Sequence, residues 1–227
     1  MMSKNIVITG TSSGIGLELT KFFIKNKHHV LAISRNNSDL RNLNLNGLYA
    51  IDFDITNFQK YDLLNKYLNN FKNVDVLINN AGLLINKPFE ETSLEDFQKV
   101  YSTNVFSVAM LTKFLIKRMN NKSNVVNISP VGGVEGTLKF SGLSAYSSSK
   151  GALNILTEML AEEYKENGIH FNSLALGSVE TKMLKKAFPG FQASTSAKDM
   201  AKYIYNFAME GYKLINGKVI SISSTTP

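Results

Sequence analysis

Two side chains suited to proton transfer, Tyr146 and Lys150, lie four residues apart in this sequence. The residues from Ala145 to Asn167 have the apolar spacing of a helix, and a separation of four puts both side chains on one face, within reach of each other. An ammonium beside a phenol favours the phenolate and so lowers the pKa of the tyrosine. We therefore expect Tyr146 to give a proton to a forming alkoxide or to remove one from an alcohol.

A glycine-rich segment, Thr9-Gly10-Thr11-Ser12-Ser13-Gly14-Ile15-Gly16, follows a short apolar run and opens a helical pattern. Glycines let the backbone pass close to a pyrophosphate, and the free N–H groups and dipole of a helix N-terminus attract its negative charge. A glycine cluster alone would equally fit a tight turn, but its place between a strand and a helix favours dinucleotide binding. The expected cofactor-binding residues of this segment are Gly10, Ser12, Ser13, Gly14, Ile15 and Gly16.

The residues after the second and third apolar runs bear on which dinucleotide fits. An acidic side chain at the end of the second strand accepts hydrogen bonds from a free ribose hydroxyl and repels a phosphate. This chain has Ser34 and Arg35 there, and because a guanidinium fork suits phosphate, we expect NADP(H) in preference to NAD(H). The alternative is a solvated surface arginine. Asp54 and Ile55 follow the third run, where the carboxylate is placed to hold an adenine amino group or, alternatively, to cap the next helix.

Short apolar runs rich in β-forming residues alternate with segments of helical spacing. The runs are Asn5 to Thr9, Val30 to Ser34, Leu48 to Phe53, Val74 to Ile78, Val125 to Ile128, Phe171 to Ala175 and Val219 to Ile222. Strands that alternate with helices need crossover connections, which predicts an α/β, doubly wound sheet of about seven mainly parallel strands with helices on both faces. The longest helices are expected at Leu94 to Met119 and Ala145 to Asn167. An irregular, mobile flap over a site is expected at Lys182 to Ser196.

Composition narrows the class of protein. The 227 residues, 44% of them hydrophobic, are enough for one core, so we predict a single domain over residues 1–227. The chain has no cysteine, and His28 and His29 have no partnering carboxylates, so we expect no metal site. No stretch is long enough to cross a bilayer, and the expected compartment is the cytoplasm. The net charge of +7 is spread along the chain, which disfavours a nucleic-acid partner and suits a phosphorylated cofactor.

Three motifs together resemble those of the short-chain dehydrogenase/reductase family. They are Thr9 to Gly16, Asn79-Asn80-Ala81-Gly82 and Tyr146-Ser147-Ser148-Ser149-Lys150, in the family's order and after strands one, four and five. The resemblance covers nearly the whole chain. It implies a seven-stranded Rossmann-type fold in which the second motif stabilises the sheet centre. It also implies that Asn80, Ala81 and Gly82 line the cofactor cleft.

The resemblance implies roles for further residues. Asn104 matches the family asparagine that supports a water-linked proton path from a kinked helix, and Lys150 should also hold the nicotinamide ribose. The segment from Leu176 to Thr181 resembles the one that closes over the nicotinamide, with Leu176 in place of the usual proline. Thr181 matches the hydroxyl that holds the carboxamide. The cofactor residues expected in this segment are Gly177, Val179 and Thr181.

The chain departs from the family at the third catalytic residue, a serine after strand five whose hydroxyl polarises the substrate carbonyl. Pro130 stands at that position and has no donor. Sixteen positions separate Pro130 from Tyr146, whereas the family's interval is roughly thirteen, which lands on Gly133. The loop is therefore longer than usual. We expect Ser129 to supply the missing hydroxyl, with Ser141 and Ser144 as alternatives. The expected catalytic residues are therefore Tyr146, Lys150, Asn104 and Ser129.

The leading hypothesis is an NADP(H)-dependent oxidoreductase that interconverts a carbonyl and an alcohol by hydride transfer, with Tyr146 as general acid and base. The substrate is a small molecule that the sequence does not identify. The alternative is a catalytically weak dinucleotide-binding sensor or scaffold that has lost the catalytic serine. The family commonly pairs its two long helices, and apolar residues on the second one permit a homodimer or homotetramer here. They are Ala152, Leu153, Ile155 and Leu156.

Overall fold

The computed structural model describes residues 3–223. Its main sheet contains seven strands in the order β3-β2-β1-β4-β5-β6-β9, and every pairing in it is parallel. The strands are β1 (Asn5–Thr9), β2 (His29–Ser34), β3 (Leu48–Asp52), β4 (Val76–Asn79), β5 (Asn124–Pro130), β6 (His170–Leu176) and β9 (Lys218–Ile222). The strand order reverses between β1 and β4, and such a reversal opens a crevice at the carboxyl ends of the strands.

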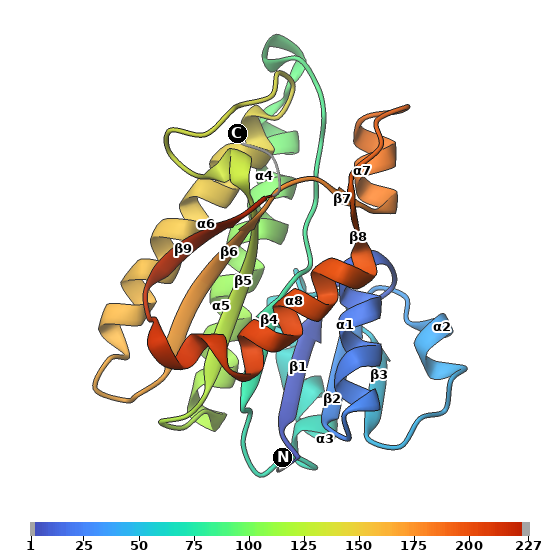
Figure 1. The fold of residues 1–227 in the computed structure, drawn as a ribbon, viewed down its shortest axis with the longest axis vertical. Helices are drawn as coiled ribbons and strands as arrows, with labels where there is room; N and C mark the ends of the chain where they lie inside the picture. Colours follow the sequence, from blue (N-terminus) through green and yellow to red (C-terminus); the bar gives the residue numbers. More distant parts are fainter. Residues whose placement is uncertain (1–2, 224–227) are drawn as a thin grey trace.

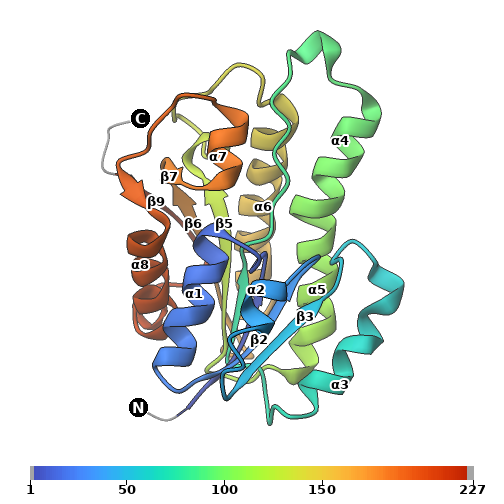
Figure 2. The same cartoon turned by 90° about the vertical axis from the view of Figure 1, so that its right-hand side faces the viewer.

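Helices cover both faces of this sheet (Figures 1 and 2). Their bounds are α1 (Gly14–Lys25), α2 (Ser38–Arg41), α3 (Asn65–Leu68), α4 (Leu94–Tyr101), α5 (Ser107–Leu115), α6 (Ser144–Glu163), α7 (Lys182–Ala187) and α8 (Ala197–Met209). Helices α1 and α8 pack on one face, whereas α3, α5 and α6 pack on the other. Shorter helical turns are η1 (Phe58–Leu64), η2 (Phe89–Glu91), η3 (Ser102–Phe106), η4 (Ile116–Arg118), η5 (Val131–Gly133) and η6 (Gly211–Leu214).

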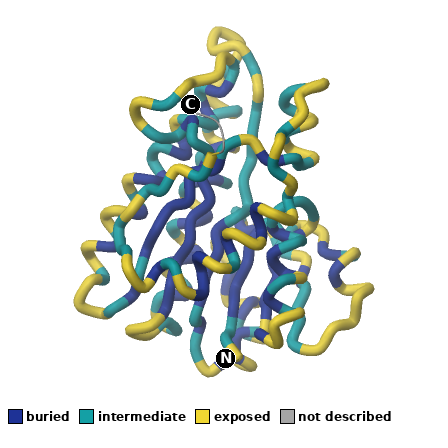
Figure 3. The backbone as a smooth tube through the Cα atoms, in the orientation of Figure 1, coloured by how far each residue is buried: buried dark blue, intermediate teal, exposed yellow. Residues whose placement is uncertain are grey.

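The central strands are apolar on both sides because the sheet lies between two helical layers. In β1, Ile6 and Ile8 belong to the core under α1 and α8, while Val7 between them belongs to the core under α3 and α5. Successive side chains of a strand point to opposite faces, so a strand covered on both faces is a continuous apolar run. Figure 3 shows the result, with buried strands at the centre and exposed residues on the outer helix surfaces and loops.

The α/β class and the mainly parallel, seven-stranded sheet predicted from the sequence are confirmed. The helix expected over Leu94 to Met119 is interrupted. It consists of α4, a π-helical turn at η3, then α5 and η4. A π turn shifts the hydrogen-bond register of a helix and commonly marks a functional site.

The flap expected as irregular chain contains regular structure. Residues 182–187 form α7, because the Thr181 hydroxyl accepts a hydrogen bond from the Leu184 N–H at 3.2 Å and caps the helix N-terminus. A short parallel pair joins β7 (Val179–Glu180) to β8 (Thr195–Ser196) across this segment. The segment is therefore tied at both of its ends.

Candidate active site

A cavity of about 1000 Å³ opens at the carboxyl ends of the central strands. Nearly all the residues expected to bind the cofactor line it. They are Gly10, Ser12, Ser13, Gly14, Ile15, Ser34, Arg35, Asp54, Ile55, Asn80, Ala81, Gly82, Tyr146, Lys150, Gly177, Val179 and Thr181. Ser129 also lines the cavity, whereas Gly16 and Asn104 do not. The topology thus brings the glycine-rich loop and the Tyr146–Lys150 pair to one space.

The glycines of the first loop are required by close packing. Gly10 has a φ of +73°, and a Cβ on it would lie 2.7 Å from the Cα of Ala81. A Cβ on Gly16 would collide with the Gly10 carbonyl oxygen, so Gly16 lets the helix approach the loop and does not face the cavity. No side chain caps the N-terminus of α1 at Ser13. The first residues of α1, Gly14 and Ile15, line the cavity, and their N–H groups, which no side chain caps, suit an anion there.

A buried asparagine that the sequence analysis missed fixes the ends of β2 and β3. The Asn37 amide donates to the carbonyls of Ala32 at 3.0 Å and Ile51 at 2.7 Å, and its Oδ1 accepts from the Thr11 hydroxyl at 2.8 Å. Its place two residues after Arg35 is the only signal in the sequence, and its burial depends on the tertiary fold. Asn37 joins the glycine-rich loop to the strand ends that carry Arg35.

The two groups expected at the adenosine end differ in how they are held. Arg35 is exposed at the cavity edge and takes part in none of the ion pairs found among residues 3–223. The Oδ1 of Asp54 accepts hydrogen bonds from the N–H of Thr56 at 2.9 Å and from its hydroxyl at 2.7 Å. Asp54 therefore closes a turn before η1 and also borders the cavity, so the structure contains features of both readings of this residue.

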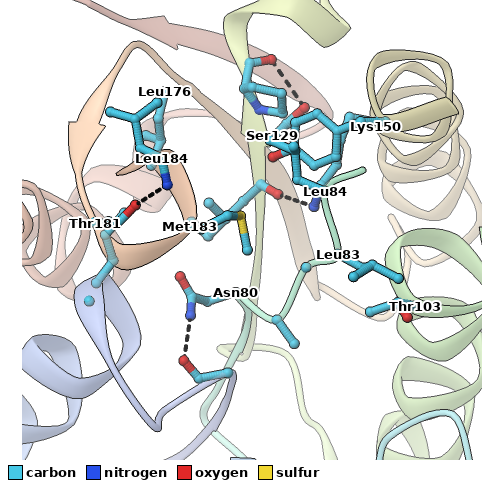
Figure 4. Close-up of a pocket in the computed structure, with 18 of the residues that line it drawn as sticks. Asn80, Leu83, Leu84, Thr103, Ser129, Lys150, Leu176, Thr181, Met183 and Leu184 are labelled. Atoms are coloured by element: carbon cyan, nitrogen blue, oxygen red, sulfur yellow. Dashed lines mark hydrogen bonds between the residues drawn. The ribbon is translucent and has the colours of Figure 1, made fainter. Parts of the chain in front are cut away.

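The Asn79–Gly82 motif connects the sheet centre to the cavity. The Asn80 amide donates to the Gly10 carbonyl at 3.0 Å, a contact drawn in Figure 4, and Thr9 Oγ1 accepts from the backbone N–H of Asn80 at 3.1 Å. Asn79 donates to Asn127 Oδ1 at 2.8 Å, and Asn127 in turn donates to the Thr157 hydroxyl at 2.8 Å. This buried polar chain links β4, β5 and α6, which fixes α6 relative to the glycine-rich loop.

Tyr146 and Lys150 are both placed on the cavity wall by the first turns of α6. The Lys150 ammonium is buried and donates to the Ile128 carbonyl at 2.7 Å, as Figure 4 shows. Burial raises the pKa of Tyr146 to about 12 and lowers the pKa of Lys150 to about 8. The expectation that the lysine lowers the tyrosine pKa is therefore wrong for this structure. Desolvation disfavours both charged forms and is the cause of both shifts.

Asn104 lies within the π turn η3 and is fully buried. Its Oδ1 accepts from the Leu83 N–H at 2.8 Å, and its Nδ2 donates to the Leu83 carbonyl at 2.9 Å and to Ser149 Oγ at 3.0 Å. A Cβ on Gly82 would lie 3.6 Å from Asn104 Oδ1 and 3.8 Å from Lys150 Nζ. The helix is interrupted by a π turn at Asn104, and the Asn104 carboxamide and the Lys150 ammonium both lie close to Gly82.

The segment after β5 contains the departure from the family pattern. Pro130 ends β5, and the hydroxyls of Ser129 and Ser147 line the cavity beside it. Ser129 Oγ is 3.4 Å from the Pro130 carbonyl oxygen, a long contact (Figure 4). Ser141 and Ser144, the alternatives to Ser129, are not among the lining residues. Ser147 was missed as a candidate, although it directly follows Tyr146 in the sequence.

The η5 turn that follows Pro130 is pressed against α6. A Cβ on Gly133 would lie 2.9 Å from Lys150 Cβ and 3.1 Å from Ser129 Oγ. The Gly133 carbonyl accepts from Asn154 Nδ2 at 3.0 Å, and Asn154 Oδ1 accepts from the Ser173 hydroxyl at 2.7 Å. These contacts hold the turn between α6 and β6, and they place Ser129 on the lysine side of the cavity.

The flap segment closes the other side of the cavity. Thr181 and Leu184 lie there with their capping hydrogen bond, near Leu176 and Met183 (Figure 4). A Cβ on Gly14 would lie 3.3 Å from the Thr181 methyl carbon, so α7 begins directly above the glycine-rich loop. The Thr181 hydroxyl accepts in its capping bond, which leaves its hydrogen available to a ligand.

Comparisons with known proteins agree with this arrangement. A model of the short chain dehydrogenase family matches residues 4–191. Carbonyl reductase (NADPH) 2 of Sus scrofa is 29% identical over 170 residues, which span 74% of this chain and 68% of the relative. The structure of ElxO with NADP bound is 32% identical, with a TM-score of 0.85 over 97% of both chains. The structure of 4-hydroxyisoleucine dehydrogenase complexed with NADH is 29% identical, with a TM-score of 0.81 over 97% of this chain and 96% of that one.

Described residues of the chain contain no group of three or more histidine, cysteine, aspartate or glutamate side chains placed to hold a metal ion. Among the same residues, no helix combines the length and the apolar character needed to span a membrane. The family model covers most of the chain, and the seven-stranded parallel sheet is the fold that the resemblance implies. The chain belongs to the short-chain dehydrogenase/reductase family.

Proposed function

We propose that the protein is an NADP(H)-dependent oxidoreductase that interconverts a carbonyl and an alcohol. The observation that carries this proposal is the position of Tyr146 and Lys150 on the wall of the same cavity that the glycine-rich loop borders. A dinucleotide laid along the loop would extend toward these two side chains. A nicotinamide dinucleotide supplies the hydride when it is bound.

The residues of the cavity fit such a dinucleotide. Gly10 and Gly14 have positive φ values that a tight loop around a phosphate requires, and the uncapped N-terminus of α1 suits the pyrophosphate. Lys150 would hold the ribose next to the nicotinamide, and Thr181 would hold the carboxamide. Arg35 would pair with the phosphate that distinguishes NADP(H) from NAD(H). Support for a nicotinamide dinucleotide also comes from the similar structures, of which one is described with NADP and another with NADH.

Tyr146 is the proton donor in the direction of carbonyl reduction. With a pKa raised to about 12, its phenol is protonated at neutral pH and can give its proton to the alkoxide that forms on the substrate. The reverse reaction needs the phenolate, so the rate of alcohol oxidation should rise with pH. The pKa of Lys150, which burial lowers to about 8, lies well below that of Tyr146, so Lys150 would favour the phenolate only at a pH where it still carries its charge.

Ser129 supplies the hydroxyl that polarises the substrate carbonyl in this proposal. It lines the cavity, and among the described residues the only hydrogen bond of its hydroxyl is the long one to the Pro130 carbonyl. Asn104 is the positioning residue behind the pair, because it joins Leu83 to Ser149 on the helix that carries Tyr146. Its link to a proton path through water belongs to the proposal.

The test mixes the protein with NADPH and a panel of aldehydes and ketones and measures NADPH oxidation by its absorbance. We expect turnover by the wild-type protein and a loss of several orders of magnitude in kcat for Tyr146→Phe, which keeps the ring and removes the proton. Tyr61→Phe is a matched control, because Tyr61 is a buried tyrosine outside the cavity lining. No turnover with any substrate, or a Tyr146→Phe variant as active as the wild type, would refute the proposal.

A second candidate function is a dinucleotide-binding sensor or scaffold with weak catalysis, and Pro130 at the serine position favours it. Loss of one oxyanion donor costs on the order of a hundredfold in rate, which weakens catalysis without abolishing it. Calorimetric binding of NADPH together with an absence of hydride transfer would support this candidate. NADPH oxidation that depends on Tyr146 would refute it.

We also propose a homo-oligomer that forms through the outer surfaces of α4, α5 and α6. Exposed apolar side chains gather on these helices and on the π turn between α4 and α5. They are Leu94, Phe106, Met110, Ile155 and Met159. Leu153 is fully buried in the structure and is not available for this contact, unlike Ile155, which is 61% exposed. Exposed apolar surface of this kind suits a subunit interface.

A further inference from the structure

One side of the cavity is formed by apolar side chains that the proposed proton transfer does not use. They come from the loop between η5 and α6 and from the flap, and we call them the apolar wall. The apolar wall consists of Leu138, Phe140, Met183, Leu184, Phe188 and Phe191. Several of them are also partly open to solvent, with Phe140 and Phe191 each 50% exposed. Large apolar side chains that are exposed around a cavity mark a binding surface.

The two halves of the apolar wall are joined to each other. The rings of Phe140 and Phe188 meet edge to face with centroids 6.2 Å apart. Asn86, from the loop between β4 and α4, donates its amide to the Ala187 carbonyl at 2.8 Å, and the neighbouring Lys87 N–H donates to the Gly142 carbonyl at 2.9 Å. Three segments distant in sequence are thus bound together over the cavity. The apolar wall is therefore a built surface of the folded chain.

The charged residues that line the cavity all belong to segments other than the apolar wall. Arg35 and Asp54 lie at the ends of β2 and β3, and Lys150 lies beside Ile128. The remaining two, Glu95 and Lys99 on α4, form an ion pair of 2.7 Å. Within the described residues, neither the loop nor α7 contributes a charged side chain to the lining, even though α7 is rich in lysine.

This distribution of charge discriminates between classes of carbonyl substrate. A carboxylate placed against the apolar wall would lose water and find no ionic partner there, and a sugar would lose hydrogen bonds to water that apolar side chains cannot replace, so both are disfavoured. An apolar group at the same place would lose contact with water and gain contact with the aromatic rings, which is favourable. The apolar wall thus favours substrates with an apolar group and disfavours substrates with a carboxylate or a sugar.

We propose that the substrate is an uncharged carbonyl compound with a largely apolar body, which packs against Phe140 and Phe188 while its carbonyl lies beside Tyr146. This inference rests on the proposed reductase function and adds the substrate class to it. Phe140 and Phe188 are then residues that determine specificity.

The test uses linear methyl ketones of increasing chain length, with NADPH oxidation as the readout. Each buried methylene is worth about 0.8 kcal/mol, so kcat/KM should rise roughly fourfold per added methylene until the cavity is filled. A ketone of the same length with a carboxylate at its far end should be reduced at least tenfold less efficiently. A flat dependence on chain length, or a preference for the charged ketone, would overturn the inference.

Variants of the apolar wall test which side chains cause the dependence of kcat/KM on chain length. In Phe140→Ser and Phe188→Ser, the ratio of kcat/KM between a long and a short ketone should fall by about tenfold, and this ratio does not depend on the fraction of active protein. Phe89→Ser is the matched control, because Phe89 is 69% exposed and lies outside the cavity lining. It should leave the ratio unchanged. An equal fall in the control would show that the apolar wall does not select the substrate.

A binding measurement separates this inference from the reductase proposal. The same ketones are titrated into protein mixed with NADPH, and NADPH fluorescence reports the ternary complex. Binding that strengthens with chain length but gives no oxidation would support the apolar substrate site and refute the reductase function. NADPH oxidation that does not depend on chain length would support the reductase function and refute the apolar substrate site.

Discussion

The hydroxyl of Ser129 is the group whose role can be tested most directly, because the neighbouring Pro130 has no donor. We expect Ser129→Ala to lower kcat by about a hundredfold, or about 2.7 kcal/mol of transition-state stabilisation, with little change in KM. The fold should tolerate the change. The contact that it removes, to the Pro130 carbonyl, is 3.4 Å long and beyond an ordinary O–H···O distance, so the unfolding free energy should fall by about 0.5 kcal/mol or less.

A second substitution in the same background makes this prediction specific. Pro130 has φ −85° and ψ 157°, an extended conformation that serine adopts freely. In the described sheet, β5 pairs with β4 only as far as Asn127, so at Pro130 the strand has a neighbour only in β6. A serine at this position therefore fits without displacing a strand, and Pro130→Ser should restore at least tenfold of the rate lost in Ser129→Ala.

The assay is NADPH oxidation under saturating substrate, with thermal unfolding measured on each variant. Ser147→Ala is the control, since its hydroxyl also lines the cavity but lies one residue beyond the tyrosine on α6. It should change kcat by less than about threefold. Full activity in Ser129→Ala would refute the assignment of the hydroxyl. A hundredfold loss in Ser147→Ala instead would transfer the role to that residue.

Further predictions concern the cofactor, the fold and the assembly. Arg35→Ser should raise the KM for NADPH at least tenfold and leave that for NADH nearly unchanged, and equal effects on both would exclude a phosphate contact. Burial, followed by Lys4, lowers the pKa of His28. The unfolded chain then binds more protons below about pH 6.5, so urea stability should fall as the pH drops through this range, and His28→Phe should remove that part of the slope. Ile155→Glu should reduce the mass measured by light scattering, whereas an unchanged mass would exclude α6 from the interface. Asn154→Leu leaves the Gly133 carbonyl without its donor and should lower the unfolding free energy, measured by urea titration, by about 2 kcal/mol. A loss below about 0.5 kcal/mol, which is close to the error of such titrations, would contradict this role.

The sheet was predictable because its strands are buried on both faces. A strand such as β1, with Ile6, Val7 and Ile8 all buried, must be a continuous apolar run, and such a run between helical patterns is visible in the sequence. The apolar spacing did not show the interruption of the long helix at Asn104, which only the family resemblance indicated. The side chain of Asn104 accepts from the Leu83 N–H and donates to the Leu83 carbonyl, and only the fold brings Leu83 near.

The local signal for α7 was present but was outweighed. Thr181 is a good N-cap residue, and Met183 and Leu184 follow it, but the nearby Phe188, Pro189 and Gly190 are typical of irregular chain. The direction of the Tyr146 pKa shift is a different case. Spacing along a helix shows that a lysine is near a tyrosine, but not how far both are removed from water, and here the loss of hydration decides the direction.

The contacts of α6 explain how the site accommodates Pro130. Lys150 donates to the Ile128 carbonyl before the proline, and Asn154, one turn further along the same helix face, donates to the Gly133 carbonyl after it. Both bonds are made to carbonyl oxygens, which proline alters no more than serine does. The end of β5 is thus held on both sides of position 130 by groups that do not depend on the side chain there. We therefore expect a proline at this position to leave the strand that carries Ser129 in place, so that Ser129 can offer its hydroxyl to the cavity.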